Sequence, residues 1–492
     1  MGRETGTKRE GASWGRTLRL AAGGTVVAAL AIGIVPLVRP SGLASAAPAA
    51  PAASGPAPWD EGRPGALLLH LNSQPLDVAL EAPRRRVIVL NAWDRHYIAD
   101  IGAHNPQATI LVYQDMSSTR SYAGAVDGGQ DAALLPTGVG YVEAESTDPS
   151  WFLVDGAGQR MEWGAYPGHW QMDTGNPAYQ QRWLENVRAR LDADGWDGVF
   201  MDNALTDADA YHSGTVSPLY PNDAAMQAAT RSMLSAVGPA LRGAGYQVAA
   251  NISASRLYPG LLADWLQFLD GALEEFWVNW NYTVGGPYVP DWGATGWKDI
   301  VDEITVAESM GRWLAVRTPG NSDDRQALLY GLGSYLLANG GRSTFAFTGH
   351  DAYSAATSWD PELTWDLGAA TGGYYQIDHK LYRRDFADGV VIVNASDSAT
   401  RTVALGSSYL DPDDATVDQV TLGPTRATIL RSVAGAPATT PDPPAEESGA
   451  GSSSPPATTP PPSTTPPAAS AGVLYPLQYF QIFGVTFYLV PG

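Results

Sequence analysis

Short apolar runs alternate with longer segments of helical character through the middle of this chain. Each run contains consecutive apolar residues and does not alternate strictly with polar ones, which is typical of strands covered on both faces in a parallel sheet. The pattern predicts eight strands, over Ala66–Leu71, Val87–Leu90, Thr109–Tyr113, Trp196–Asp202, Tyr246–Asn251, Gly271–Trp277, Trp313–Arg317 and Ser343–Phe347.

Between these runs, apolar residues recur at the spacing of a helix. The clearest helices are predicted over Pro177–Leu191, Ala224–Arg242, Arg256–Leu269 and Asp323–Ala338. Eight strands with helices in the gaps are typical of a (β/α)8 barrel. We therefore predict an α/β fold, with a TIM barrel over residues 64–362.

The gap between the third and fourth strands is too long for a simple crossover. It contains two strand-like segments, Trp151–Val154 and Arg160–Trp163, on either side of the turn-rich Asp155–Gly158. This pattern predicts an inserted β-hairpin, which we expect to overhang the carboxyl ends of the strands.

From Tyr375 onward, strands follow one another without helices. They are predicted over Lys380–Phe386, Val390–Asn394, Thr402–Leu405, Thr416–Val420 and Ala427–Leu430. This rhythm indicates a small C-terminal antiparallel β-sandwich over residues 363–432, with a structural role.

The two ends of the chain have a different composition. Residues 1–46 join basic residues, an apolar run and the small-residue site Ala44–Ala46, as in a secretory signal, although the run is long enough for an uncleaved N-terminal anchor. Residues 47–63 form an Ala/Pro-rich spacer, and residues 433–471 form a Pro/Thr/Ser-rich linker. The apolar tail, residues 472–492, fits a membrane anchor, a docking strand or a shortened module. We expect a protein that is secreted or held at the cell envelope.

Composition bears on both stability and partners. The chain has no cysteine, so its stability must come from a large core and not from disulfides. Its net charge is −21, and loss of residues 1–46 would make it −25. Nucleic acid is therefore an improbable partner.

Acidic residues stand where two of the predicted strands end. Asp202 closes the fourth run, and the pair Glu274 and Glu275 lies in the sixth. Barrel enzymes keep their chemistry at this end of the strands, and alternate strands lie about 9–10 Å apart. Two carboxylates facing one site can act as nucleophile or base and as proton donor, which suits glycosidic cleavage. The alternative for Asp202 is a helix cap.

Other polar and aromatic residues also fall near strand ends. We expect sugar contacts from the polar residues Asn91, Asp94, Asp115, Asn203, Asn251 and Arg317. Aromatic platforms for sugar rings are predicted at Trp93, Tyr113, Trp163, Trp170, Trp277 and Trp280. For each polar residue alone, a cap or loop hydrogen bond is the structural alternative.

Competing chemistries have little support in the sequence. A thiol nucleophile is excluded, and no Gly-x-Ser-x-Gly motif is present. The seven histidines have no metal-ligand spacing, and no glycine-rich phosphate loop occurs, so we expect neither metal nor cofactor.

Several motifs together resemble the secreted barrel proteins grouped as hypothetical glycosyl hydrolase family 15. The similarity spans about residues 64–432 and is carried by Leu111–Thr119, Met172–Pro177 with Trp183, Asp197–Asn203, Asp270–Trp277, and Leu381–Phe386 with Val390–Asn394. It implies that Asp202 is the nucleophile or transition-state partner. It also implies that Glu275, five residues after Asp270, is the acid/base, with Glu274 as the rival. Asp173, within a family motif, is implied as a substrate contact.

Placement of the acids at the fourth and sixth strand ends is also similar to retaining α-galactosidase-type barrels, which favours an α-linked sugar. Two functions follow from these observations. The first is a secreted glycoside hydrolase that acts on an extracellular or cell-wall polysaccharide. The second is a catalytically inactive barrel that binds or scaffolds a polysaccharide at the envelope.

Overall fold

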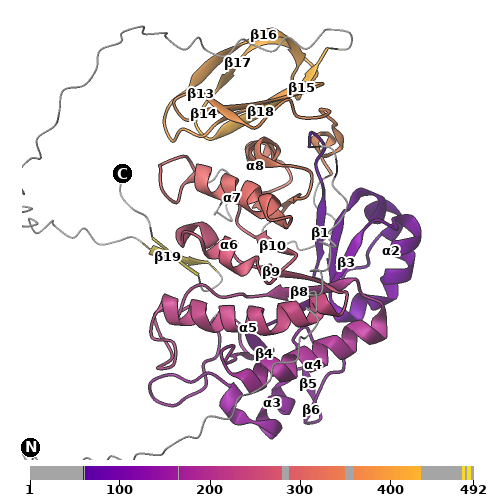
Figure 1. Ribbon diagram of the computed structural model, residues 1–492, viewed down its shortest axis with the longest axis vertical. Helices are drawn as coiled ribbons and strands as arrows, with labels where there is room; N and C mark the ends of the chain where they lie inside the picture. Colours follow the sequence, from indigo (N-terminus) through magenta and orange to yellow (C-terminus); the bar gives the residue numbers. More distant parts are fainter. Residues whose placement is uncertain are drawn as a thin grey trace, which may run out of the picture. The chain divides into compact units, whose positions relative to one another are not determined.

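A barrel of parallel strands forms the centre of the structure (Figure 1). The computed structural model describes residues 59, 61–164, 166–279, 288–349, 359–433, 479–482 and 485–488. Eight strands pair in chain order, and one parallel bridge between Ala66 and Phe345 joins the first edge to the last, so the barrel is nearly closed. The strands are β1 (Leu67–His70), β2 (Val87–Leu90), β3 (Thr109–Asp115), β8 (Gly198–Asp202), β9 (Gln247–Asn251), β10 (Gly271–Glu274), β11 (Trp313–Pro319) and β12 (Thr344–Thr348). The predicted α/β TIM-barrel fold is confirmed.

Helices cover the outside of the barrel and follow the predicted positions with one exception. They are α1 (Val78–Glu81), α2 (Ile98–His104), α4 (Pro177–Asp194), α5 (Asp223–Gly243), α6 (Leu261–Trp265), α7 (Trp297–Ser309) and α8 (Arg325–Ala338), with 3-10 turns η1 (Ala82–Arg84), η2 (Ala92–Tyr97) and η4 (Ser255–Leu257). The single helix predicted over Arg256–Leu269 was wrong, because Pro259 disfavours helical backbone at Tyr258 and separates η4 from α6.

A long insertion lies between β3 and β8, as the gap in the pattern predicts. It contains β4 (Ser118–Arg120), β5 (Val126–Asp127), β6 (Gln130–Asp131), α3 (Tyr141–Thr147), η3 (Pro149–Trp151) and β7 (His169–Gln171). The predicted hairpin is present as an isolated antiparallel bridge between Val154 and Arg160, closed by a turn in which Asp155 accepts hydrogen bonds from the N–H groups of Ala157 and Gln159. β4 pairs with β7, so the insertion is tied back to the end of β3.

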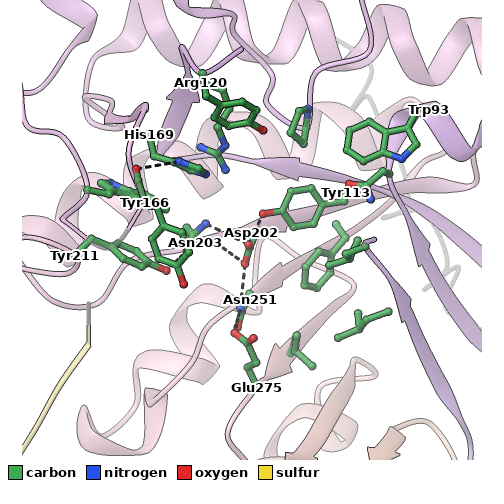
Figure 2. A pocket seen from close by; sticks show the side chains of 18 residues that line it. Trp93, Tyr113, Arg120, Tyr166, His169, Asp202, Asn203, Tyr211, Asn251 and Glu275 are labelled. Carbon is green, nitrogen blue, oxygen red and sulfur yellow. Dashed lines mark hydrogen bonds between the residues drawn. The ribbon is translucent and has the colours of Figure 1, made fainter. Parts of the chain in front are cut away.

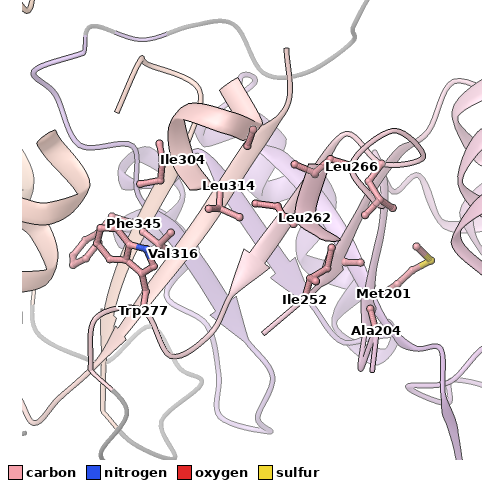
Figure 3. Packing of buried hydrophobic residues seen from close by; sticks show 14 of the residues in the cluster. Met201, Ala204, Ile252, Leu262, Leu266, Trp277, Ile304, Leu314, Val316 and Phe345 are labelled. Atoms are coloured by element: carbon pink, nitrogen blue, oxygen red, sulfur yellow. The ribbon is translucent and has the colours of Figure 1, made fainter. Parts of the chain in front are cut away.

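The barrel strands are buried on both faces, which explains their continuous apolar sequence. Inward-facing residues such as Val89, Phe200 and Leu273 form one cluster inside the barrel. Outward-facing residues such as Met201 and Leu314 pack against the helices in a second, larger cluster (Figure 3). The barrel interior is therefore a packed core, and a site can open only beyond the strand ends.

The C-terminal antiparallel domain is one curled six-stranded sheet with the order β13-β14-β15-β18-β16-β17 (Figure 1). After η5 (Pro361–Thr364), its strands are β13 (Tyr375–Asp378), β14 (Leu381–Phe386), β15 (Gly389–Asn394), β16 (Arg401–Leu410), β17 (Thr416–Leu422) and β18 (Arg426–Ser432). Val391 and Val393 join the large barrel cluster, while Val390 and Ile392 join a cluster within the sheet. β15 is thus buried on both faces and fixes the sheet to the barrel.

Most of the two chain ends lies outside the described residues. This holds for the signal or anchor, for the linker beyond Val433, for most of the spacer and for Trp280. The tail contributes a short hairpin, β19 (Tyr479–Ile482) and β20 (Val485–Tyr488). Within the described part of the chain, no helix combines the length and apolar character needed to cross a membrane.

Candidate active site

A cavity of about 330 Å³ opens at the carboxyl ends of the barrel strands. Side chains alternate between the two faces of a strand, so the next inward side chain after the last one in the apolar interior lies two residues further along. These side chains form the floor of the cavity. Six strands supply a lining residue there: Leu71, Asn91, Tyr113, Asp202, Asn251 and Glu275. The predicted residues Asp202, Asn251 and Tyr113 are therefore brought together in one cavity with Glu275.

The two strands that carry the acids each begin with an Asp-Gly pair that has the same structural role. Asp197 accepts a hydrogen bond from the Ile110 N–H (2.8 Å), and Asp270 accepts one from the Val248 N–H (3.0 Å). A Cβ on the following glycine would lie 1.9 Å from the Gln247 carbonyl oxygen at Gly198, and 2.2 Å from the Trp313 ring at Gly271. The first acid of each motif is therefore structural, and the glycine permits close packing of the next strand.

Strand alternation also separates the two adjacent glutamates. Leu273 faces the barrel interior, so Glu275 faces inward and lines the cavity, whereas Glu274 faces the helices and is buried. The carboxylate of Glu274 accepts hydrogen bonds from the N–H groups of Ala254 (2.8 Å) and Phe276 (3.3 Å). Of the two rivals, only Glu275 is placed where a substrate could reach it.

One side-chain amide connects the two carboxylates of the cavity (Figure 2). Asn251 Nδ2 donates to Asp202 Oδ1 (3.0 Å) and to Glu275 Oε2 (2.9 Å), while its Oδ1 accepts from the Ser253 hydroxyl (2.8 Å). The Ser253 bond fixes the amide with both N–H groups on the acids. Asp202 and Glu275 therefore share a donor and face the same space.

Asp202 is surrounded by donors. Tyr113 donates its hydroxyl to Oδ2 (2.5 Å), and Asn203 donates its backbone N–H to Oδ1 (2.9 Å) and its amide to Oδ2 (3.2 Å). Burial raises the pKa of Asp202 to about 7, and the negative charges of Asp115 and Glu275 add to the rise, whereas the bonds from Tyr113 and Asn251 oppose it. Every direct contact of Asp202 thus suits its ionised form.

A second amide connects Asp202 to Asp115, which is fully buried and does not line the cavity. Asn203 Nδ2 donates to Asp115 Oδ2 (2.8 Å), and its Oδ1 accepts from the Tyr211 hydroxyl (2.6 Å). Arg120 pairs with Asp115 at 2.8 Å. The result is a row of three carboxylates separated by two amides, with a cation at one end.

Aromatic side chains form the walls of the cavity. Tyr211 stacks on Trp163 with ring centroids 3.8 Å apart and an interplanar angle of 9°. Trp93 is 40% exposed and Tyr122 is 41% exposed, which leaves their rings accessible to a ligand. The other aromatic lining residues are Tyr113, Tyr166, His169 and Phe200. Burial, with help from Arg120, lowers the pKa of His169 to about 4, so this wall is neutral at neutral pH.

Five further predicted contacts lie away from the cavity lining: Asp94, Trp170, Asp173, Trp277 and Arg317. Asp173 accepts hydrogen bonds from Tyr220 and from the Gly175 N–H. Trp277 is in the outer core, where its indole N–H donates to the Ile300 carbonyl (Figure 3). Arg317 is buried and donates to Thr348 and to the Glu275 carbonyl. Arg317 therefore supports the backbone of the site, and its role as a sugar contact stays a prediction.

Five polar or aromatic lining residues outside the barrel strands were not expected from the sequence: Arg120, Tyr122, Tyr166, His169 and Tyr211. The first four come from the insertion, and Tyr211 comes from the loop after β8. The only signal was the position of Arg120 directly after the Leu111–Thr119 motif. Among the described residues, no group of three or more His, Asp or Glu is arranged to hold a metal ion.

The chain is similar, at low sequence identity, to several solved structures. The glycoside hydrolase domain of PelA from Pseudomonas aeruginosa is 15% identical over 60% of this chain and 98% of that one, with a TM-score of 0.38. Ega3 from Aspergillus fumigatus, in complex with galactosamine, is 12% identical over 60% and 94%, with a TM-score of 0.37. An α-amylase from Malbranchea cinnamomea is 10% identical over 76% and 96%, with a TM-score of 0.42.

None of the curated proteins compared with the chain matches it. A family model does match, over residues 103–390, which is more than half of the chain and includes both carboxylates of the cavity. The chain therefore belongs to hypothetical glycosyl hydrolase family 15.

Proposed function

We propose that this protein is a secreted glycoside hydrolase that cleaves O-glycosidic bonds of an extracellular or cell-wall polysaccharide. The observation that carries the proposal is the amide of Asn251, which holds Asp202 and Glu275 against one aromatic cavity. Paired carboxylates are the machinery of most glycosidases, and aromatic walls bind the apolar faces of sugar rings. Family membership supports the same reaction class.

We assign Asp202 as the nucleophile. Its contacts with Tyr113, Asn203 and Asn251 are all with donors, so an ionised carboxylate is stabilised and a proton on it would displace one of them. The proposal therefore gives the ionised carboxylate to Asp202. Asp202 then attacks the anomeric carbon as the glycosidic bond breaks.

Glu275 is the acid/base in this proposal. It donates its proton to the leaving oxygen in the first step and accepts one from water in the second. The two bridged oxygens are 3.0 and 2.9 Å from Asn251 Nδ2 and so lie within about 6 Å of each other. This separation supports a retaining reaction, which needs carboxyl groups about 5–5.5 Å apart rather than about 6.5–9.5 Å. An α-linked substrate is part of the proposal through the resemblance to α-galactosidase-type barrels.

The test is hydrolysis by the full chain of a panel of α- and β-linked neutral and amino-sugar polysaccharides. We expect Asp202→Asn to lose activity while it still binds the glycan that the wild type cleaves. Asp192→Asn, on the exposed end of α4, is the matched control and should be fully active. No product from any glycan, with equal binding by all three proteins, would instead favour the inactive polysaccharide-binding barrel.

Secretion is tested separately. We expect the protein in the culture medium to begin after the Ala44–Ala46 site, as N-terminal sequencing would show. An intact N-terminus in the membrane fraction would favour the anchor.

A further inference from the structure

A second, smaller cavity lies beside the candidate active site. It measures about 50 Å³, and four of its lining residues, Asn203, Tyr211, Asn251 and Glu275, also line the main cavity. We call it the side cavity. The space suffices for one or two water molecules, since a water occupies about 30 Å³ in the liquid.

Both polar and apolar residues complete the lining of the side cavity. Asp207 and Ser253 contribute a carboxylate and a hydroxyl, while Ala210 and Phe276 are apolar. The Ser253 hydroxyl donates to Asn251, which leaves its oxygen lone pairs to accept, and the Asp207 carboxylate accepts from Tyr258. With Glu275, these groups give a water the two to four polar partners that ordered internal waters have.

We propose that the side cavity binds the water that completes hydrolysis. This inference rests on the proposed function, because it concerns the second step of the reaction. In that step the water oxygen bonds to the anomeric carbon, the bond from that carbon to Asp202 breaks, and Glu275 takes the proton. The water must therefore stand beside Glu275 while the sugar is still attached to Asp202.

The position of the side cavity meets this requirement. In this proposal the attached sugar occupies the main cavity next to Asp202, whereas the side cavity borders Glu275 together with Tyr211 and Asn251. A water stored there needs no path past the sugar. We expect larger acceptors, such as methanol or a second glycan, to enter through the main cavity, which measures about 330 Å³ against about 50 Å³ for the side cavity.

The proposal is tested by filling the side cavity and measuring how the intermediate partitions. Ala210→Leu and the smaller Ala210→Val place methyl groups in the space. Ala208→Leu is the matched control, because Ala208 is 3% exposed, against 2% for Ala210, and lies in the same apolar cluster but does not line the side cavity. The probe is the 4-nitrophenyl glycoside that the wild type turns over fastest, with added methanol.

We expect the ratio of methyl glycoside to free sugar to rise about tenfold in Ala210→Leu, less in Ala210→Val, and not at all in Ala208→Leu. The ratio does not depend on how much of each variant folds. Turnover with the same ratio in all proteins would overturn the water site and leave the hydrolase standing. Absence of turnover by the wild type would overturn the proposed function itself. A high-resolution crystal structure should also show an ordered water between Ser253 and Glu275 in the wild type and in Ala208→Leu, but not in Ala210→Leu.

Discussion

Glu274 and Glu275 are neighbours in the chain, yet they belong to acid clusters on opposite faces of β10. Glu275 shares the Asn251 amide with Asp202 and opens to the cavity. Glu274 lies among the outer helices, where Arg256 and Glu303 are its charged neighbours. The first cluster is accessible to a ligand, and the second is closed.

Titration alone does not distinguish the two clusters. Burial raises the pKa of Asp202 to about 7 in the open cluster, and it raises the pKa of Glu274 to about 7 in the closed one. Shared amides and access to a cavity separate them instead. A raised pKa therefore marks burial, and only geometry indicates which acid can do chemistry.

The largest effect is expected from replacing each of the two glutamates, in turn, by glutamine. Glu275→Gln should lower kcat about 10³-fold, or about 4 kcal/mol, because it removes the acid/base. Glu274→Gln, the matched control, should keep kcat within about threefold because glutamine resembles the protonated acid. Steady-state kinetics on the best glycan decides this. A larger loss in Glu274→Gln would transfer the role to the closed cluster.

The closed cluster should matter for stability. Arg256 is buried, and its charge lowers the pKa of Glu274 against the effect of burial. Arg256→Met should reduce the free energy of unfolding by about 3 kcal/mol, with kcat per folded molecule unchanged. The exposed Arg231→Met, which loses a surface pair with Asp264, should cost less than about 1 kcal/mol. Equal losses in urea titrations would contradict a structural role for Arg256.

The same cluster predicts how stability depends on pH. Burial raises the pKa of Glu274 from 4.5 to about 7 and that of Glu303 from 4.5 to about 8. Between these limits the two folded-state acids hold more protons than in the unfolded chain, so their contribution to stability is greatest near pH 4.5 and falls as pH rises to about 8. The contribution that is lost should amount to several kcal/mol in urea titrations of wild type compared with Glu303→Gln. Stability of the variant should depend less steeply on pH in this direction, and identical slopes for the two proteins would refute the assignment.

The open cluster was largely predictable because it follows local rules. The Asp-Gly pairs begin β8 and β10, and alternation from Leu273 sends Glu275 inward. The same reasoning failed for Trp277, because β10 ends at Glu274 and strand alternation no longer applies three residues later. The bridging role of Asn251 was not visible either, since it depends on the register between β8, β9 and β10.

The cavity walls were less predictable than the floor. Tyr166 and Tyr211 come from irregular loops, which have no periodicity to read. Tyr211 has a positive φ of 66°, rare for a bulky residue, and it is held there by the stack on Trp163 and the bond to Asn203. Such positions are decided by tertiary packing and not by local sequence.

Removing the shared amide should have an intermediate effect. Asn251→Ala should lower kcat about 30-fold, or about 2 kcal/mol, because the two carboxylates lose their common donor. The hydrogen bond from Asn251 lowers the pKa of Asp202, so its loss should move the acid limb of the pH–rate profile to higher pH. Asn186→Ala, on α4 away from the site, should show neither change. An unchanged acid limb in Asn251→Ala would mean that the bridge does not control Asp202.

The smallest effect is expected one step further from the reacting atoms. Tyr211→Phe keeps the ring stack on Trp163 but loses the hydroxyl that orients the Asn203 amide. Misorientation of that amide weakens one donor to Asp202, so kcat should fall about fivefold, or about 1 kcal/mol, with KM nearly constant. The acid limb should shift upward, as in Asn251→Ala but less. If KM rises while kcat and the acid limb stay constant, the Tyr211 hydroxyl binds the sugar directly, and the wall, not the row of acids, is where it acts.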